Sequence, residues 1–269
     1  MINNDIVNKA INYIMLHILE PITLEEVADY CNISKFYFSK IFKAETGESV
    51  YGFIKRVKLD QSALRLRLES QKTITDIGLD YGYSASNYST AFKNHMHLSP
   101  YEFRKQTDSI STNTQISFEE IDKQIKIEIH PDYKVIYERK ISDYKDMKND
   151  WCDFTEKYSK YITSKTIFFE RTYDDPTITE KNHCIYDICM TYPENSGLKN
   201  TTVLTGGKFA VFPFKGFIKD ISETHVLLLR NIWFPQSGYE LDNRLSYELY
   251  HYVDNETMYM EFDICIPIK

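Results

Sequence analysis

The first hundred residues contain an internal repeat, which constrains the fold more than any other feature of the sequence. When the chain is shifted by 50 residues, Phe42 falls on Phe92 and Phe53 falls on Phe103. Small and polar positions coincide in the same way. A repeat of this length is one supersecondary unit used twice, so the two copies are expected to fold alike.

Each copy has the pattern of a helix-turn-helix motif. An acid-rich apolar helix is predicted at 23–30 and again at 75–81, followed by a short polar turn. Ser34 and Ser84 then precede a second helix, and serine is a favoured N-cap residue. The small residues Ala28 and Gly78 stand where the two helices of a copy must cross closely.

A single helix is predicted between the copies, over residues 50–69. Its apolar positions, such as Val50, Ile54 and Val57, share one face. About 18 helical residues span roughly 27 Å. This spacer would hold two recognition helices about one DNA turn apart, near 34 Å, on one side of a duplex. One helix-turn-helix pattern is a weak signal, but two joined by a helix form a strong one.

The overall charge of −7 hides an uneven distribution along the chain. Residues 1–107 have a net charge of +1, whereas residues 108–269 have a net charge of −8. Within residues 35–67 there are eight basic and three acidic side chains. Because a charge acts over roughly one Debye length, about 8–10 Å, this local excess is compatible with binding to DNA.

The outward positions of the two recognition helices are the candidates for contact with DNA. Phe36 can contact a thymine methyl group, Lys40 can donate to guanine O6 or N7, and Asn87 can pair with adenine. The alternative is that these positions are only a solvated helix face. The full set of candidates is Lys35, Phe36, Ser39, Lys40, Lys43, Ser86, Asn87, Thr90 and Lys93.

The remainder of the chain differs from the repeat in the spacing of its apolar residues. The polar stretch TDSISTNTQIS (107–117) predicts a linker, placed at 108–118, after an all-α domain at 1–107. Short alternating runs beyond it predict an α+β domain at 119–269. Two β-α-β-β halves are expected to form one sheet, with two helices on one face and a ligand groove on the other. The predicted elements are strand 126–139, helix 143–159 and strands 166–173 and 183–191, then strand 202–214, helix 219–232 and strands 244–252 and 259–267.

The stretch YELYHYV (247–253) predicts a site for an organic cation. Alternate residues of a strand share a face, so Glu248, Tyr250 and Tyr252 are expected to point the same way. A carboxylate between aromatic rings suits a cation in a concave site. A solvated strand face is the alternative. The sequence favours ordinary core positions for the further aromatic candidates for the groove, which are Tyr137, Tyr173, Tyr186, Phe212, Phe214 and Trp233.

Cysteine usage and the N-terminal segment suggest a cytoplasmic protein that does not bind a membrane. The five cysteines include no C-x-x-C and no zinc spacing with histidine. Asp5, Lys9, His17 and Glu20 interrupt the first apolar stretch, which is therefore an amphipathic helix. No nucleophile–histidine pair, metal constellation or phosphate loop is recognised, so no catalytic residue, metal or cofactor is expected.

Two resemblances give these patterns a functional meaning. Residues 22–105, with ITLEEVADYCNISKFYFSKIFKAETGESV and ITDIGLDYGYSASNYSTAFKNHMHLSPYEFRK, resemble the AraC/XylS-type DNA-binding region. The C-terminal region resembles the GyrI-like effector-binding domain through GGKFAVFPFKG (206–216), IWFPQSGYEL (232–241), YELYHYV and DICIPIK (263–269). In multidrug-binding regulators with this domain, a glutamate at the position of Glu248 contacts the cationic ligand.

The resemblances imply a ligand-responsive transcription factor. Promoter DNA, a small-molecule effector and RNA polymerase are its expected partners, and drug-efflux or stress genes its plausible targets. Two alternatives stay open. The C-terminal domain is a hydrolase in which Glu248 is a general base, or it is a ligand-free module for a protein partner.

Overall fold

The computed structural model describes the chain as two compact units. The first unit comprises Met1–Ser109 together with Asp174–Glu180, and the second comprises Ile110–Tyr173 together with Lys181–Lys269. The described residues are all except 3, 112–116, 144–146, 176, 194–195, 218–227 and 255, together with the side chains of 107–111, 228, 230 and 231.

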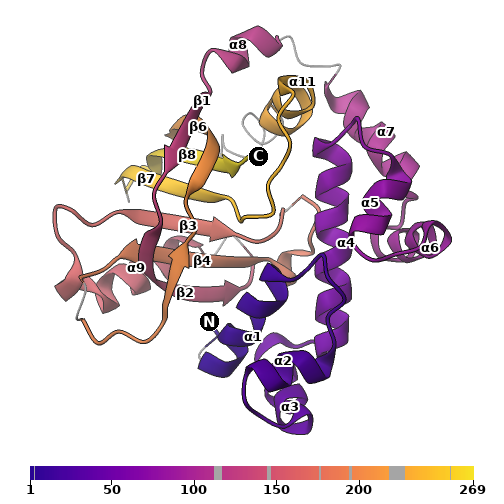
Figure 1. Cartoon of the computed structure of the whole chain (residues 1–269). Coiled ribbons are helices and arrows are strands. Elements are labelled where there is room, and N and C mark those ends of the chain that lie inside the picture. Colours follow the sequence, from indigo (N-terminus) through magenta and orange to yellow (C-terminus); the bar gives the residue numbers. More distant parts are fainter. Residues whose placement is uncertain are drawn as a thin grey trace. The chain divides into compact units, whose positions relative to one another are not determined.

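The first unit is helical, as the sequence predicts. Two helix pairs, α2–α3 and α5–α6, lie near opposite ends of the long helix α4 (Figure 1). None of the helices in the described ranges is long and apolar enough to cross a bilayer. The helices are α1 (Asp5–Leu16), α2 (Leu24–Tyr30), α3 (Lys35–Thr46), α4 (Val50–Leu68), α5 (Ile74–Asp80), α6 (Ala85–Met96) and α7 (Pro100–Ser111).

The repeat in the sequence is also a repeat in the packing. Phe38 meets Phe42 edge to face with ring centroids 5.5 Å apart, and Tyr88 meets Phe92 in the same way at 5.5 Å. Phe42 and Phe92 each make a second edge-to-face contact with the helix that follows. The two helix-turn-helix motifs therefore have matching aromatic cores.

The predicted caps and the predicted close crossing are confirmed. The Ser34 and Ser84 side chains accept hydrogen bonds from the backbone N–H groups three residues later. A Cβ atom built on Gly78 would lie 2.7 Å from Cγ of Tyr88, so a larger residue would force the ring to move. In both turns a residue with positive φ, Asn32 or Gly82, precedes the cap.

Seven residues that lie between two strands of the second unit in the sequence belong to the first unit. Within this segment, Ile178 packs against the apolar cluster formed by α4, α5, α6 and α7. Thr179 Oγ1 donates a hydrogen bond to Asp60 at 3.0 Å. Arg67 donates to Thr177 Oγ1 at 2.7 Å and pairs with Asp175 at 3.4 Å. The sequence pattern did not predict this arrangement.

The second unit is built on one antiparallel sheet of eight strands, in the order β1-β6-β8-β7-β3-β4-β2-β5. Figure 1 shows helix α9 beside β4 and β2. The elements are α8 (Phe118–Asp122), β1 (Lys126–His130), β2 (Tyr133–Ile141), α9 (Met147–Lys157), β3 (Phe168–Thr172), β4 (Ile185–Thr191), β5 (Thr201–Leu204), β6 (Gly207–Phe217), the π-helix Leu228–Trp233, α11 (Phe234–Ser237), β7 (Tyr247–Asp254) and β8 (Tyr259–Pro267), with 3-10 turns at Ser159–Tyr161 and Lys181–His183.

The strand order reflects the predicted duplication. Strands β2, β3 and β4 with α9 form one half, and β6, β7 and β8 belong to the other, so the halves meet where β3 pairs with β7. The duplicated α+β fold is thereby confirmed. The second predicted helix, 219–232, lies mostly outside the described residues. Helix α7 continues to Ser111, inside the predicted linker, of which residues 112–116 are not described.

Two predictions of continuous strands, at 126–139 and 202–214, were wrong. Each of these strands is broken, and the leading piece pairs with the other half: β1 with β6, and β5 with β2. The breaks lie close together, because a Cβ atom on Gly206 would be 2.4 Å from the carbonyl oxygen of His130. Asp132 accepts a hydrogen bond from the Gly206 N–H at 2.7 Å, and Pro131 has no N–H to offer a sheet.

The two faces of the sheet have different cores. One face packs on α9 through an apolar cluster that includes Phe154, Ile188 and Met190. The other face holds a cluster of apolar side chains around Phe169 and Tyr247. On a strand, successive side chains alternate between these faces, so the register decides what each residue contacts.

Candidate functional site

The predicted DNA-contacting residues lie on the outer surfaces of α3 and α6. Phe36 is 80% exposed, so its ring is free to contact a partner. Ser39 is half-buried, and the Thr90 hydroxyl donates to the Ser86 carbonyl at 3.1 Å, so its methyl group and lone pairs are left for a partner. Exposed positions among the candidates are Lys35, Phe36, Lys40, Lys43, Ser86, Asn87, Thr90 and Lys93.

Much of the basic charge counted in the sequence is engaged within the first unit. Arg56 is buried and pairs with Glu48 at 2.8 Å and with Asp60 at 3.4 Å. Arg65 pairs with Glu69 at 2.6 Å. Lys35, on α3 itself, pairs with Glu25 at 2.7 Å. The excess of basic residues within 35–67 is therefore not a free cationic surface, and the case for DNA contact rests on individual residues of α3 and α6.

Exposed tyrosines extend the candidate DNA interface beyond the sequence prediction. Tyr37 on α3 is 52% exposed, while Tyr51 and Tyr101 are 77% and 66% exposed. Tyr51 and Tyr101 are equivalent under the shift of 50 residues, and each is the second residue of a helix that follows a recognition helix. The repeat itself was therefore the signal that would have identified them.

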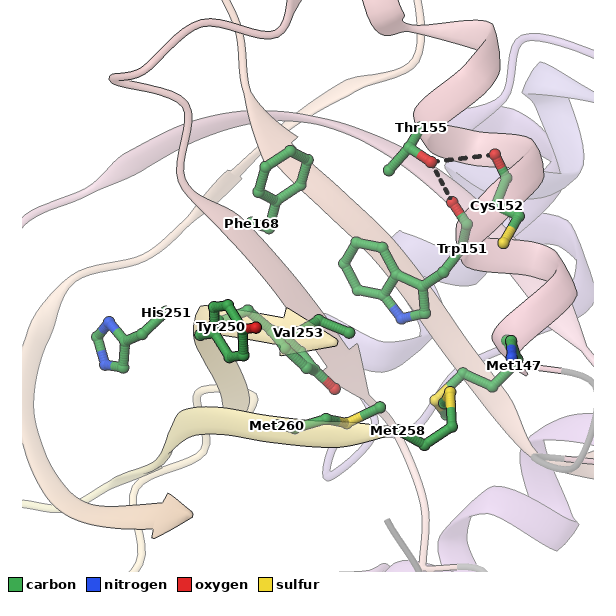
Figure 2. A pocket seen from close by; sticks show the side chains of 12 residues that line it. Met147, Trp151, Cys152, Thr155, Phe168, Tyr250, His251, Val253, Met258 and Met260 are labelled. Atoms are coloured by element: carbon green, nitrogen blue, oxygen red, sulfur yellow. Dashed lines mark hydrogen bonds between the residues drawn. The ribbon is translucent and has the colours of Figure 1, made fainter. Parts of the chain in front are cut away.

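The second unit contains an apolar pocket of about 310 Å³ between α9 and the strands β3, β7 and β8. In Figure 2, Trp151, Phe168, Tyr250 and Met258 surround the space. The pocket lies on the α9 face of the sheet, so the prediction of a groove on the face opposite the helices was wrong. Its lining residues are Met147, Lys148, Trp151, Cys152, Thr155, Phe168, Tyr250, His251, Tyr252, Val253, Met258 and Met260.

An irregularity in β7 explains why four consecutive residues of this strand line the pocket. The pairing of β7 with β8 shifts between Tyr250 and Tyr252, as in a β-bulge. The prediction that Tyr252 continues the alternation from Glu248 and Tyr250 was therefore wrong. Beyond the bulge the alternation is reset, and Val253 also reaches the pocket wall.

Two carboxyl groups lie behind the aromatic wall of the pocket. Glu170 on β3 is directly opposite Glu248 on β7. Tyr250 donates to Glu248 at 3.0 Å and its hydroxyl lies 3.4 Å from Glu170. The Trp151 indole N–H donates to Glu170 at 3.4 Å. Two pocket-lining rings thus connect the cavity to both carboxyl groups.

Burial changes the acidity of Glu170 and of Tyr250. Glu170 is 1% exposed, and this burial, together with the charge of Glu248, raises its pKa well above the ordinary range. The bonds from Trp151 and Tyr250 oppose the rise. Burial likewise raises the pKa of Tyr250, which stays a neutral donor. Glu170 was not among the predicted site residues, although it has the same place in the first half that Glu248 has in the second.

Other predicted ligand-binding residues lie away from this pocket. Tyr173 is buried with the ion cluster of Arg139, Arg171 and Asp187, where its hydroxyl donates to Asp187 at 2.7 Å. Tyr137 lies with its ring 5.3 Å from the Arg139 guanidinium. Of the predicted set, Tyr250 lines the pocket, and Glu248 accepts a hydrogen bond from the Tyr250 hydroxyl at 3.0 Å.

The remaining predicted aromatic residues have partners elsewhere in the second unit. Tyr186 donates to Asp150 at 2.5 Å, and Trp233 donates to Asp122 at 2.8 Å. Phe212 is buried in β6, and Phe214 packs against Phe262. Met147 and Trp151 lie one helical turn apart on a predicted helix. This spacing was the sequence signal that would have indicated the helical wall of the pocket.

The pocket also holds a cysteine and a histidine, which raises the question of nucleophilic catalysis. Figure 2 shows Cys152 and His251 on opposite sides of the cavity. The His251 imidazole is 2.8 Å from Asp263, on the neighbouring strand. Among the described residues there is no group of three His, Cys, Asp or Glu side chains suited to a metal ion.

Comparisons with known proteins agree with both units. The chain matches a helix-turn-helix domain over residues 27–106 and a GyrI-like small molecule binding domain over residues 123–269. Among solved structures, the C-terminal domain of AraT, a response regulator from Geobacillus stearothermophilus, is 33% identical, with 38% of this chain and 86% of that chain covered and a TM-score of 0.36.

Two similar curated proteins are named as regulators. An uncharacterized HTH-type transcriptional regulator of Staphylococcus aureus (strain COL) is 32% identical over 116 residues, which are 43% of this chain and 15% of that protein. YbfP of Bacillus subtilis (strain 168), with the same description, is 31% identical over 115 residues, or 42% and 39% of the two chains. The chain spans well under two thirds of these relatives. It belongs to the family of transcriptional regulators that join an AraC-type helix-turn-helix region to a GyrI-like small-molecule-binding domain.

Proposed function

We propose that this regulator binds promoter DNA through α3 and α6 and senses a hydrophobic organic cation in the pocket beside α9. The observation that carries the proposal is a pocket of apolar and aromatic walls, with the half-buried carboxyl group of Glu248 and the buried one of Glu170 behind them. Aromatic faces attract a cation, and a carboxylate with little access to water gains from neutralisation.

For DNA, the proposal assigns base contacts to the outward residues of α3 and α6. Lys40 and Asn87 supply donors suited to guanine and adenine, and the exposed Phe36 suits a thymine methyl group. The exposed Tyr51 and Tyr101 are assigned to the sugar–phosphate backbone, because they flank the recognition helices without belonging to them.

Titration of a promoter fragment by fluorescence anisotropy tests this assignment. Lys40→Ala is expected to cost about 1–3 kcal/mol on the specific site and to relax the preference at one base pair. Lys123→Ala, an exposed change in the second unit, is the control and is expected to have no effect. Equal weakening on random DNA would make Lys40 a phosphate contact and refute its assigned role.

For the ligand, the proposal gives Glu248 the charge contact and Trp151, Phe168 and Tyr250 the apolar contacts. Isothermal titration with tetraphenylphosphonium, compared with the uncharged triphenylphosphine oxide, separates charge from apolar burial. Glu248→Gln is expected to weaken binding of the cation at least tenfold, or about 1.4 kcal/mol, because it removes the half-buried carboxylate that meets the charge. It should leave the uncharged molecule nearly unaffected.

Glu261→Gln is the control for this titration, because Glu261 is on β8 and pairs with Lys215 at the surface. Equal heats for the wild-type protein and Glu248→Gln would remove the role assigned to Glu248. Mass spectrometry of the ligand after incubation distinguishes binding from hydrolysis, since new products would favour an enzyme.

The biological setting follows from the proposed chemistry. A regulator that senses hydrophobic cations would control genes for efflux or stress tolerance, act in the cytoplasm where promoter DNA is available, and work with RNA polymerase. Coupling requires that the ligand favour one of two states of the protein. Transcription assays with purified polymerase, with and without tetraphenylphosphonium, test this setting directly.

A further inference from the structure

The two halves of the second unit each contribute one glutamate to the strand pair where they meet. Glu170 on β3 and Glu248 on β7 are opposite each other in the antiparallel register. Carboxylates directly opposite on one face of a sheet repel when both are ionised. Glu170 is 1% exposed, so water screens this repulsion poorly. The arrangement therefore favours a proton on one of the two groups.

The hydrogen bonds around Tyr250 indicate where that proton lies. The Tyr250 hydroxyl is 3.0 Å from Glu248 and 3.4 Å from Glu170, yet a phenol has one hydrogen to donate. If this hydrogen goes to Glu248, a hydrogen bond with Glu170 needs a hydrogen from Glu170. A protonated Glu170 supplies it, and the chain of bonds from Glu170 through Tyr250 to Glu248 is then complete.

The other groups that surround Glu170 allow the same assignment. From α9, the Trp151 N–H donates to Glu170, and Asp150 pairs with Lys140 at 2.7 Å. From β4, Tyr186 and Cys189 lie near Glu170, and burial raises the pKa of each, so both stay neutral. From β8, Cys265 lies near Glu248, and Lys148 of α9 belongs to the pocket wall.

We propose that Glu170 holds a proton while the pocket is empty and releases it when the bound ligand carries a second positive charge. This inference rests on the proposed function, in which Glu248 meets the first charge. A second charge near Glu170 favours its carboxylate, and the proton passes to the solvent. Glu170 is thus a specificity-determining residue that extends the ligand range from singly to doubly charged cations.

Infrared spectroscopy of the full-length protein without ligand tests the protonation directly. The wild-type protein at neutral pH is expected to show the carbonyl band of a protonated carboxylic acid, and Glu170→Gln is expected to lack it. Glu138→Gln is the matched control, because Glu138 is also buried in the sheet but pairs with Lys157 and Tyr158. A wild-type spectrum without the band overturns the proposal, whatever the ligand does.

Titration calorimetry with two permanent cations tests the release. Tetraphenylphosphonium carries one charge, and benzyl viologen carries two; neither has a proton of its own. In the wild-type protein, one proton should be released when benzyl viologen binds. At pH values below the pKa of Glu170, the affinity should therefore increase about tenfold for each unit by which the pH is raised. The affinity for tetraphenylphosphonium should stay nearly constant over the same range.

The variant Glu170→Gln shows whether Glu170 discriminates between singly and doubly charged ligands or only supports the structure of the pocket. It is expected to keep its affinity for tetraphenylphosphonium within about threefold, and to bind benzyl viologen weakly and without pH dependence. Equal losses for both cations, or binding of benzyl viologen by the wild-type protein without proton release, would overturn the inference alone. Failure of both cations to bind the wild-type protein would overturn the proposed function and, with it, this inference.

Discussion

Asp187 is the position where a single change should reveal most about the stability of the second unit. Its carboxylate accepts hydrogen bonds from Arg139 at 2.8 Å and from Arg171, on a face of the sheet without access to solvent. Burial by itself raises the pKa of Asp187, but Arg139 and Arg171 outweigh burial and lower the pKa to about 2. The change Asp187→Asn keeps the shape and removes the negative charge.

The magnitude of the effect has two parts. At neutral pH, Asp187→Asn leaves two buried guanidinium groups without their carboxylate, which costs about 3–5 kcal/mol of unfolding free energy. A pKa lowered from 3.8 to about 2 corresponds to about 2.5 kcal/mol of that stabilisation. Because the folded-state pKa is the lower one, this stabilisation is complete at neutral pH and is lost as the pH falls toward 2.

Urea unfolding followed by tryptophan fluorescence measures this effect selectively, because Trp151 and Trp233 both belong to the second unit. The loss of unfolding free energy caused by Asp187→Asn should be about 1 kcal/mol smaller at pH 3 than at pH 5. Asp153→Asn, an exposed change on α9, is the control and should not alter the unfolding midpoint. A deficit that is the same at both pH values would refute the reasoning.

The other stability predictions concern close backbone approach and the segment 174–180. Gly206→Ala should destabilise the second unit by about 1–3 kcal/mol, because the new Cβ atom meets backbone atoms at 2.4 Å and 2.5 Å that cannot rotate away. If this variant unfolds at the same urea concentration as the wild-type protein, the close approach of Gly206 to the backbone of His130 and Pro131 is contradicted. Arg67→Ala should destabilise the first unit by about 1–2 kcal/mol, since its bonds to Thr177 and Asp175 are lost. Hydrogen exchange should then be about 5–30-fold faster in α4 peptides and unchanged in the sheet.

Local signals in the sequence predicted the first unit well. The repeat, the N-caps Ser34 and Ser84, and the small residue Gly78 each act between residues close in sequence, or recur at a fixed spacing. The same reasoning overestimated the free basic charge, because ion pairs such as Arg56 with Glu48 depend on tertiary contacts.

The pocket was predicted less completely, for reasons that lie in long-range pairing. Glu248 and Tyr250 were found from alternation along one strand. The role of Glu170 depends on the register of β3 against β7, which joins residues far apart in the chain. The breaks at Pro131 and Gly206 were visible as turn-forming residues, but their consequence, the exchange of leading strands, is a property of the whole sheet.

The first strand of each half, β1 or β5, pairs with the other half of the domain. This exchange determines whether either half can fold alone. A fragment with the first half alone would leave the outer edge of β2 without β5, the outer edge of β3 without β7, and β1 without β6. Unpaired strand edges recruit other strands, so such a fragment would complete its sheet by associating with a second copy of itself. The two halves are accordingly one cooperative structure, comparable to a dimer whose subunits have been fused end to end.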